Sequence, residues 1–220
     1  MPVSKRSIAA LIFAIAVAIV CTRLGFWQVS RLQERRAYNA LLLARLSELT
    51  LSLSDLPVDT AAGHYRRATA TGVLVYDREI AWAPRMRRGS PGVNFLTPMR
   101  IGGSDTVVLV NRGWAYSPDA RTIDFSKWHE GDSVAISGYV ETWSQECGIG
   151  SGPALPATCG DTAGRALRRL DRRAAERLVG APVARYLLMQ TSDSALRADS
   201  VPARIDLPVL DEGSHFSYAL

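Results

Sequence analysis

The sequence has little of what enzymes use for catalysis. Its three histidines lie far apart, at positions 64, 129 and 215, and His129-Glu130 is not followed by a second histidine at helical spacing, so the zinc-protease pattern is absent. The glycine-rich segment 148–152 has glycine rather than serine at its centre. This excludes a nucleophile elbow, and the spacing fits neither a phosphate-binding nor a dinucleotide-binding loop. The sequence therefore predicts no catalytic residues and gives an extracytoplasmic hydrolase little support.

The excess of basic over acidic residues is also small. The chain has 26 Lys and Arg against 21 Asp and Glu, a formal net charge of +5, and this excess is too small to indicate a nucleic-acid partner. Only two of the basic residues are lysines, so arginine carries the basicity. That bias is equally consistent with phosphate contacts, a preference for membrane surfaces and a compositional bias of the genome.

Cysteine is scarce, with three in 220 residues. Cys21 lies in an apolar run, whereas Cys147 and Cys159 flank the centre of a Gly/Pro-rich insertion at 144–164. In an oxidising compartment these two can form a disulfide, which would stabilise the fold by about 3 kcal/mol. Metal binding is the alternative, and the absence of a nearby histidine disfavours it.

The strongest signal that is present is an unbroken apolar run from Ile8 to Cys21, after a short basic segment, residues 1–7. A helix needs about 20 apolar residues to cross a bilayer, and the residues up to Trp27 complete the span. We predict a transmembrane helix over 8–27 with a short cytoplasmic tail before it. A cleaved signal peptide is the alternative, but the helical pattern continues past Cys21 without a processing site, which favours an uncleaved anchor.

Beyond the span, the periodicity predicts a juxtamembrane helix to residue 49 within a helix-and-linker segment 28–62, then a β-rich extracytoplasmic domain over 63–212. We expect a hairpin of 65–75 with 79–84, a basic loop at 85–92, and a second hairpin of 93–101 with 106–114. Strands at 133–143 and 183–190 and an amphipathic helix at 165–179 follow. The predicted fold is α+β and mainly antiparallel β, a small sandwich or partly open barrel, with an N-terminal transmembrane helix and one amphipathic helix.

The strand at 106–114 ends in polar residues that strands seldom carry: Asn111, Arg112, Gly113 and Trp114. Glycine in a strand more often marks a bulge than a ligand contact. We therefore interpret these four residues as a structural centre of the domain or a partner surface: Gly113 at a bulge, Asn111 making a turn-type hydrogen bond, and Arg112 and Trp114 packing on a neighbouring strand.

The segment 213–220 changes from polar to aromatic and apolar. It is expected to begin a second transmembrane helix that is truncated at Leu220, with Ser214 as a possible N-cap. His215 would then open that helix at the same interfacial level as Trp27. An imidazole between two membrane helices could ligate a cofactor iron.

Several short motifs occur in order along the chain, and together they resemble the Surfeit-locus cytochrome c oxidase assembly protein family, the Surf/Shy family. The motifs are Gly25-Phe-Trp-Gln-Val-Ser-Arg31, Tyr65 with Gly72, Pro84-Arg85, Pro91-Gly92 with Thr97-Pro98, Asn111-Arg-Gly-Trp114, and His215-Phe-Ser-Tyr-Ala219. The resemblance covers nearly the whole chain. No single motif is decisive, and the specificity lies in their order behind a membrane anchor.

This resemblance implies two transmembrane helices that bracket a domain in the bacterial periplasm, with the protein in the inner membrane. It also implies delivery of haem a to the core subunit of cytochrome c oxidase, with the haem a synthesis machinery and membrane lipid as further partners. His215 is implied as the ligand of the haem iron, with Tyr218 beside it and Trp27, Gln28 and Arg31 across the interface. A role for Arg31 in pairing with haem propionates is our hypothesis from its charge and position.

An alternative within the same resemblance is a scaffold. In that case the domain binds oxidase subunits and has no direct role with haem.

Overall fold

The computed structural model describes residues 5–144, 160–161, 165–192 and 202–210. The chain divides into two compact units, residues 1–44 with 208–220 and residues 45–207.

The first unit is built on helix α1 (Lys5–Ser47), 43 residues long. At 1.5 Å per residue it extends about 65 Å, roughly twice the hydrocarbon thickness of a bilayer. By length and composition, the helix from Ile8 onward could cross a membrane. From Ile8 to Trp27 its large apolar side chains are exposed on all sides, Phe13 at 72% and Phe26 at 74% among them, which is typical of a helix that lies in lipid.

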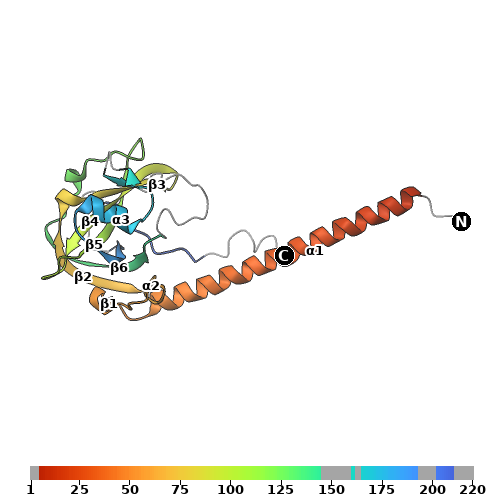
Figure 1. The fold of residues 1–220 in the computed structure, drawn as a ribbon, viewed down its shortest axis with the longest axis horizontal. Helices are drawn as coiled ribbons and strands as arrows, with labels where there is room; N and C mark the ends of the chain where they lie inside the picture. Colours follow the sequence, from red (N-terminus) through yellow and green to blue (C-terminus); the bar gives the residue numbers. More distant parts are fainter. Residues whose placement is uncertain (1–4, 145–159, 162–164, 193–201, 211–220) are drawn as a thin grey trace. The chain divides into compact units, whose positions relative to one another are not determined.

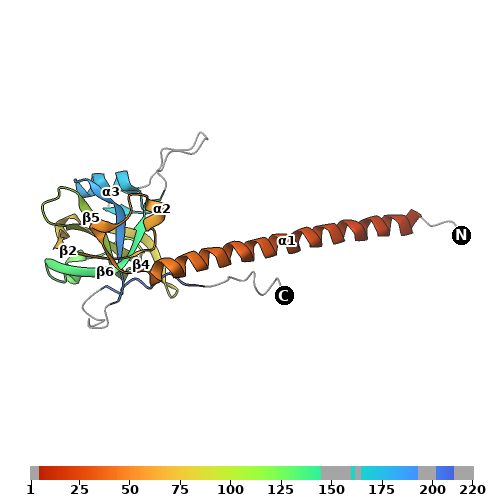
Figure 2. The same ribbon diagram turned by 90° about the horizontal axis from the view of Figure 1, so that it is seen from below.

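The second unit contains a closed barrel of five strands: β2 (Arg67–Leu74), β4 (Ser90–Arg100), β5 (Val107–Tyr116), β6 (Ser133–Thr142) and β9 (Val183–Gln190). Their order is β2-β6-β9-β5-β4, and β4 pairs back onto β2 at Val73↔Arg100 and Leu74↔Met99, which closes the barrel (Figures 1 and 2). All neighbours are antiparallel except β5 and β9, which are parallel. The OB-fold is another small five-stranded β-barrel.

Shorter elements extend the barrel. On one side of β4 the sheet continues through β3 (Ile80–Arg87), β8 (Ala166–Leu167) and β7 (Gly160–Asp161), and β1 (Leu51–Ser52) pairs with β2. Two short helices, α2 (Thr60–Gly63) and α3 (Arg172–Val179), and three 3-10 turns, η1 (Leu53–Asp55), η2 (Tyr76–Arg78) and η3 (Phe125–Trp128), complete the described part.

Strand β5 is buried on both faces because the barrel has two cores. Val108 and Val110 of β5 point into the barrel, where they meet apolar residues from the other four strands, such as Leu74, Met99 and Leu188. The alternate residues of β5 point outward and pack against Leu170, Ala174, Ala175 and Val179, in and beside α3. Figure 2 shows α3 lying over the barrel wall.

The predicted fold class is confirmed, and the β domain is a barrel rather than a sandwich. The predicted hairpin of residues 65–75 with 79–84 is wrong, because β2 pairs with β6 and β3 pairs with β4. Residues 76–78, which resemble a hairpin turn in sequence, form a 3-10 turn that carries the chain out of the barrel.

Two further boundaries differ from the sequence predictions. The expected basic loop 85–92 is a tight hairpin between β3 and β4 whose central residues, Arg88 (φ 49°) and Gly89 (φ 81°), both have the positive φ of a two-residue I′ turn. The predicted helix 165–179 begins only at Arg172, where the Asp171 carboxylate accepts from Ala174 N at 2.7 Å. Ala166 and Leu167 before it pair with β3 instead.

Candidate functional site

The most concentrated polar chemistry in the described residues is a buried ionic network around Arg112 of β5. Its side chain has no exposed surface. The guanidinium donates to Thr97 Oγ1 (2.7 Å), Glu79 Oε1 (2.6 Å) and Glu130 Oε1 (2.7 Å), and to the carbonyl oxygen of Trp128 (2.6 Å). Thr97 in turn donates its hydroxyl hydrogen to Glu79. One guanidinium therefore joins three parts of the chain: strand β4, the segment after β2 and the segment before β6.

A second arginine completes the network. Arg204 donates to the carbonyl oxygen of Arg112 (2.7 Å) and to both carboxylate oxygens of Glu130, at 3.0 Å for Oε1. Two arginines therefore face the carboxylates of Glu79 and Glu130, and their formal charges cancel. Buried ions are tolerated only with such pairing and hydrogen bonding, because removing a charge from water costs several kcal/mol.

Aromatic rings cover this network. The Arg112 guanidinium carbon lies 5.1 Å from the centroid of Tyr76 and 5.5 Å from that of Phe95. Tyr76 donates its hydroxyl hydrogen to Gly131 O (2.7 Å) and accepts from Glu130 N (2.9 Å), and burial raises the pKa of its phenol. His129 stacks on Tyr76 at 3.9 Å between centroids. The ions and rings together form a rigid packed cluster, and the arrangement does not resemble a reaction centre.

The polar end of β5, residues 111–114, has the local geometry that the sequence predicts. The register shifts between Phe95 and Leu96 of β4, opposite Gly113 and Asn111, as a bulge requires. Asn111 Oδ1 accepts from Gly113 N at 3.2 Å. Gly113 has φ 137°, and a Cβ there would lie 2.5 Å from Ala203 O, so a side chain would not fit. Trp114 donates from its indole to Arg85 O at 3.2 Å.

The sequence alone does not predict which residues pair with Arg112. Glu79, Glu130 and Arg204 carry no local pattern that separates them from surface charges. Thr97 belongs to a quoted motif, Thr97-Pro98, yet nothing in the motif points to an arginine 15 residues further on. Only the tertiary pairing of β4 and β5 joins them.

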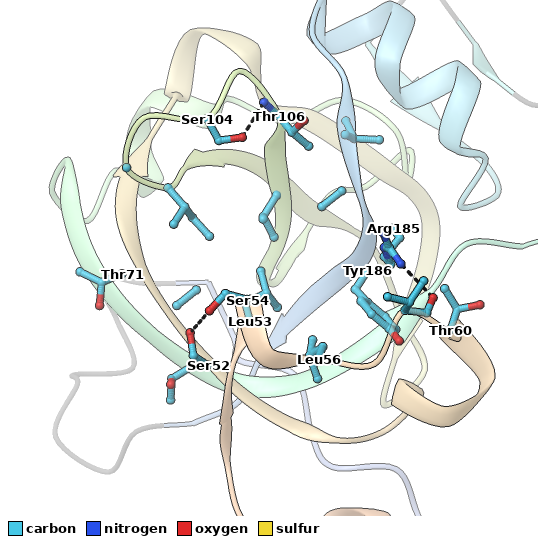
Figure 3. Close-up of a pocket in the computed structure, with 18 of the residues that line it drawn as sticks. Ser52, Leu53, Ser54, Leu56, Thr60, Thr71, Ser104, Thr106, Arg185 and Tyr186 are labelled. Atoms are coloured by element: carbon cyan, nitrogen blue, oxygen red, sulfur yellow. Dashed lines mark hydrogen bonds between the residues drawn. The ribbon is translucent and has the colours of Figure 1, made fainter.

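A cleft of about 1010 Å³ is lined by η1, the start of β5 and residues of β2 and β9. Figure 3 looks into it, with Leu53, Leu56, Tyr186 and several Ser and Thr hydroxyls around the mouth. Tyr186 donates its hydroxyl hydrogen to Pro57 O at 2.8 Å, and a second carbonyl oxygen, that of Asp59, lies 3.0 Å from the same hydroxyl. Burial raises the pKa of the Tyr186 phenol. Neither carboxylates nor histidines line the cleft, so the lining offers no acid–base pair.

Haem iron is held by His, Cys, Met or Tyr, and of these only Tyr186 lines the cleft, where its hydroxyl already contacts two carbonyl oxygens. Within the described residues, His64 pairs with Glu141 (2.5 Å) and stacks on Tyr65, and His129 stacks on Tyr76. The described lining of the cleft therefore does not fit haem ligation.

The predicted cofactor-binding residues fall in two groups. Trp27, Gln28 and Arg31 lie on α1, where the Arg31 guanidinium carbon is 5.9 Å from the Trp27 ring centroid and Arg31 pairs with Glu34 at 2.7 Å. His215 and Tyr218 lie outside the described residues, as do Cys147 and Cys159. The joint site of the two groups and the disulfide remain predictions.

The described residues place the chain in the class of proteins that join an apolar helix of membrane-spanning length to a small closed β-barrel. Within that class the particular family is clear. The sequence profile of the SURF1 family matches residues 15–220, and the chain belongs to this family.

Individual relatives are similar over shorter stretches. A SURF1-like protein of Monosiga brevicollis is 32% identical over 128 residues, 54% of this chain and 48% of the relative. The cytochrome oxidase assembly protein SHY1 of Saccharomyces cerevisiae is 29% identical over 125 residues, 54% of this chain and 32% of its own length. A SURF1-like protein of Rickettsia felis is 32% identical over 93 residues, 41% and 39% of the two chains. The matches thus span half or less of the length of these relatives.

Proposed function

We propose that the protein is a membrane-anchored assembly factor for haem-copper cytochrome c oxidase. In this proposal α1 anchors it in the inner membrane of a bacterial cell, the barrel lies in the periplasm, and the protein handles haem a for insertion into the oxidase core subunit. The observation that carries the proposal is the family match over residues 15–220, together with the similarity to a relative named as a cytochrome oxidase assembly protein.

Haem a is cargo in this proposal, so the protein makes and breaks no covalent bond. His215 would hold the iron, with Tyr218 beside it, and Trp27, Gln28 and Arg31 would line the other side of the site. This choice rests on the family match, whose profile extends to residue 220. Haem a supplies the redox-active iron that the oxidase requires, while this chain would supply only ligation and shielding.

A second candidate is a scaffold that binds oxidase subunits without handling haem. The observation that favours it is the cleft of the barrel, which has room for a ligand but offers no suitable iron ligand. Both candidates predict association with the oxidase core subunit, and they differ in whether haem travels with the protein.

The test is purification of the full gene product in detergent from cells that synthesise haem a. We expect the wild-type protein to carry a haem spectrum, His215→Ala to lose it, and His129→Ala to retain it as the matched histidine control. A spectrum unchanged in His215→Ala would contradict the ligand assignment. Wild-type protein that purifies with the core subunit but without haem would favour the scaffold.

A further inference from the structure

The outer wall of the barrel carries an aromatic surface on β3, β4 and β5, beside the outer core against which Trp82 is partly packed. In the registers of β3, β4 and β5, Trp82 pairs with Asn94 and Asn94 with Trp114, while Arg85 pairs with Gly92 and Gly92 with Tyr116. Paired residues of neighbouring strands share a face. Four large side chains, Trp82, Arg85, Trp114 and Tyr116, therefore lie on one face of three adjacent strands, and we call them the Arg85 face.

Arg85 is the unusual member of this face. Its guanidinium carbon lies 3.6 Å from the centroid of the Trp82 ring, and its Nε is buried without a hydrogen-bond partner. Across the part of the chain that the structure describes, no carboxylate lies within ion-pair distance of it. Burial lowers the pKa of this guanidinium to about 10, so it is still charged at neutral pH. The result is a partly desolvated cation with no anionic partner among the described residues.

The neighbouring arginine shows what a satisfied guanidinium looks like in the same strand. Arg87 donates to Ala203 O (2.9 Å) and Arg204 O (2.7 Å) and pairs with Asp206 at 3.1 Å. The fold can therefore supply carbonyl and carboxylate partners to an arginine of β3. Arg85, two residues earlier on the same strand, receives neither.

The Arg85 face is also held in place before any partner arrives. The indole of Trp114 donates to the carbonyl oxygen of Arg85 and lies over Gly92, where an added Cβ would be 2.4 Å from Trp114 Cε2. Tyr116 at the edge of the face is 58% exposed. A preorganised surface loses little side-chain entropy on binding, which favours affinity.

We propose that the Arg85 face is a docking site for an acidic segment of a partner protein, whose carboxylate pairs with the Arg85 guanidinium between Trp82 and the Trp114–Tyr116 edge. The planar guanidinium accepts a carboxylate through two parallel hydrogen bonds. Tryptophan, tyrosine and arginine are the residues that most often carry the binding energy of protein interfaces. This proposal goes beyond the haem-handling function and does not depend on haem being bound.

A protein partner fits this surface better than a lipid headgroup. Attraction to anionic membrane surfaces relies on clusters of about four to eight exposed basic residues. The Arg85 face instead offers one recessed cation within an aromatic frame. A recessed, framed cation selects a partner by shape as well as by charge, as protein interfaces do.

The test is a titration of the full chain, in neutral phosphatidylcholine nanodiscs, with a synthetic hexaglutamate peptide, followed by tryptophan fluorescence. We expect saturable binding that Arg85→Gln weakens about tenfold or more and that Arg85→Lys also weakens, since an ammonium lacks the planar fork. The matched control is Arg67→Gln, an exposed arginine on β2, which should change the affinity less than about twofold. Thermal melts of each variant show whether the fold is intact.

Two other outcomes would overturn the proposal. The first is binding to phosphatidylserine vesicles but not to the peptide, which would indicate a lipid site. The second is peptide binding that Arg85→Gln and Arg67→Gln weaken equally. As a measurement that does not need Arg85→Gln to fold, a photo-crosslinking residue at Tyr116 should capture, in cells, a segment of another protein that contains Asp or Glu. Crosslinks only within this chain or to lipid would contradict a protein partner.

Discussion

Arg112 and Arg85 lie in adjoining regions of the sheet, the first fully buried and the second partly buried, and their surroundings differ. Arg112 has two carboxylates, one hydroxyl and one carbonyl as acceptors, all from its own chain. Arg85 has the ring of Trp82 and no anion among the residues that the structure describes. The first region satisfies its charge internally, and the second does not.

The difference separates architecture from recognition. Internal partners fix Arg112 and connect β4, β5, the segment before β6 and the segment around Arg204, so its charge is used to hold the barrel in one arrangement. A half-buried cation without a partner adds nothing comparable to the fold. Its charge is instead available to an anion from outside the chain, which is the basis of the docking proposal.

The largest effect is expected from Arg112→Gln. Of the hydrogen bonds to the buried carboxylate of Glu79, this change leaves the one that the Thr97 hydroxyl donates, and breaking a buried pair on one side costs about 3–5 kcal/mol. Denaturant unfolding of the full chain in detergent measures the loss. Arg67→Gln, at an exposed position, should change the unfolding free energy by less than about 0.5 kcal/mol. A loss below about 1 kcal/mol in Arg112→Gln would show that the network is not structural.

An intermediate effect is expected from Thr97→Val, which keeps the shape of the side chain and removes its hydroxyl. Arg112 Nε would lose its acceptor inside the protein, and a buried unsatisfied donor costs about 1–3 kcal/mol. The same unfolding measurement applies, with Thr71→Val on the exposed side of β2 as the control. If both variants lose the same stability, the loss reflects β-strand preference rather than the network.

The strands were predictable from sequence because their signal is local. Alternating apolar residues mark 133–143, a short apolar stretch marks 183–190, and the run into Asn111 and Gly113 marks β5 and its bulge. Closure of the barrel was not predictable, because it depends on the pairing of Leu74 with Met99 after β3 has left the barrel. The turn chemistry of Tyr76 to Arg78 instead suggested a hairpin that does not form.

The buried network was only half visible for the same reason. Arg112 stands in an unusual strand end and attracts notice, whereas Glu79, Glu130 and Arg204 come from segments up to 92 residues away along the chain. No periodicity relates them. The sequence predicts a basic loop around Arg85, because the turn residues Arg88-Gly89 lack the Asn-Gly or Asp-Gly signature of a two-residue turn.

The smallest effect is expected from Arg85→Gln, the same substitution as at Arg112. At pH 7 the unfolding free energy should change by about 1 kcal/mol or less, because the lost cation–π contact with Trp82 is offset by removal of a desolvated charge.

The lowered pKa of Arg85 gives a second readout. Between about pH 10 and the unfolded value the unfolded chain binds the proton more tightly, so wild-type stability should rise with pH relative to Arg85→Gln. The rise should be modest, since the guanidinium is partly exposed. A loss at pH 7 as large as that of Arg112→Gln would remove the distinction between the two arginines.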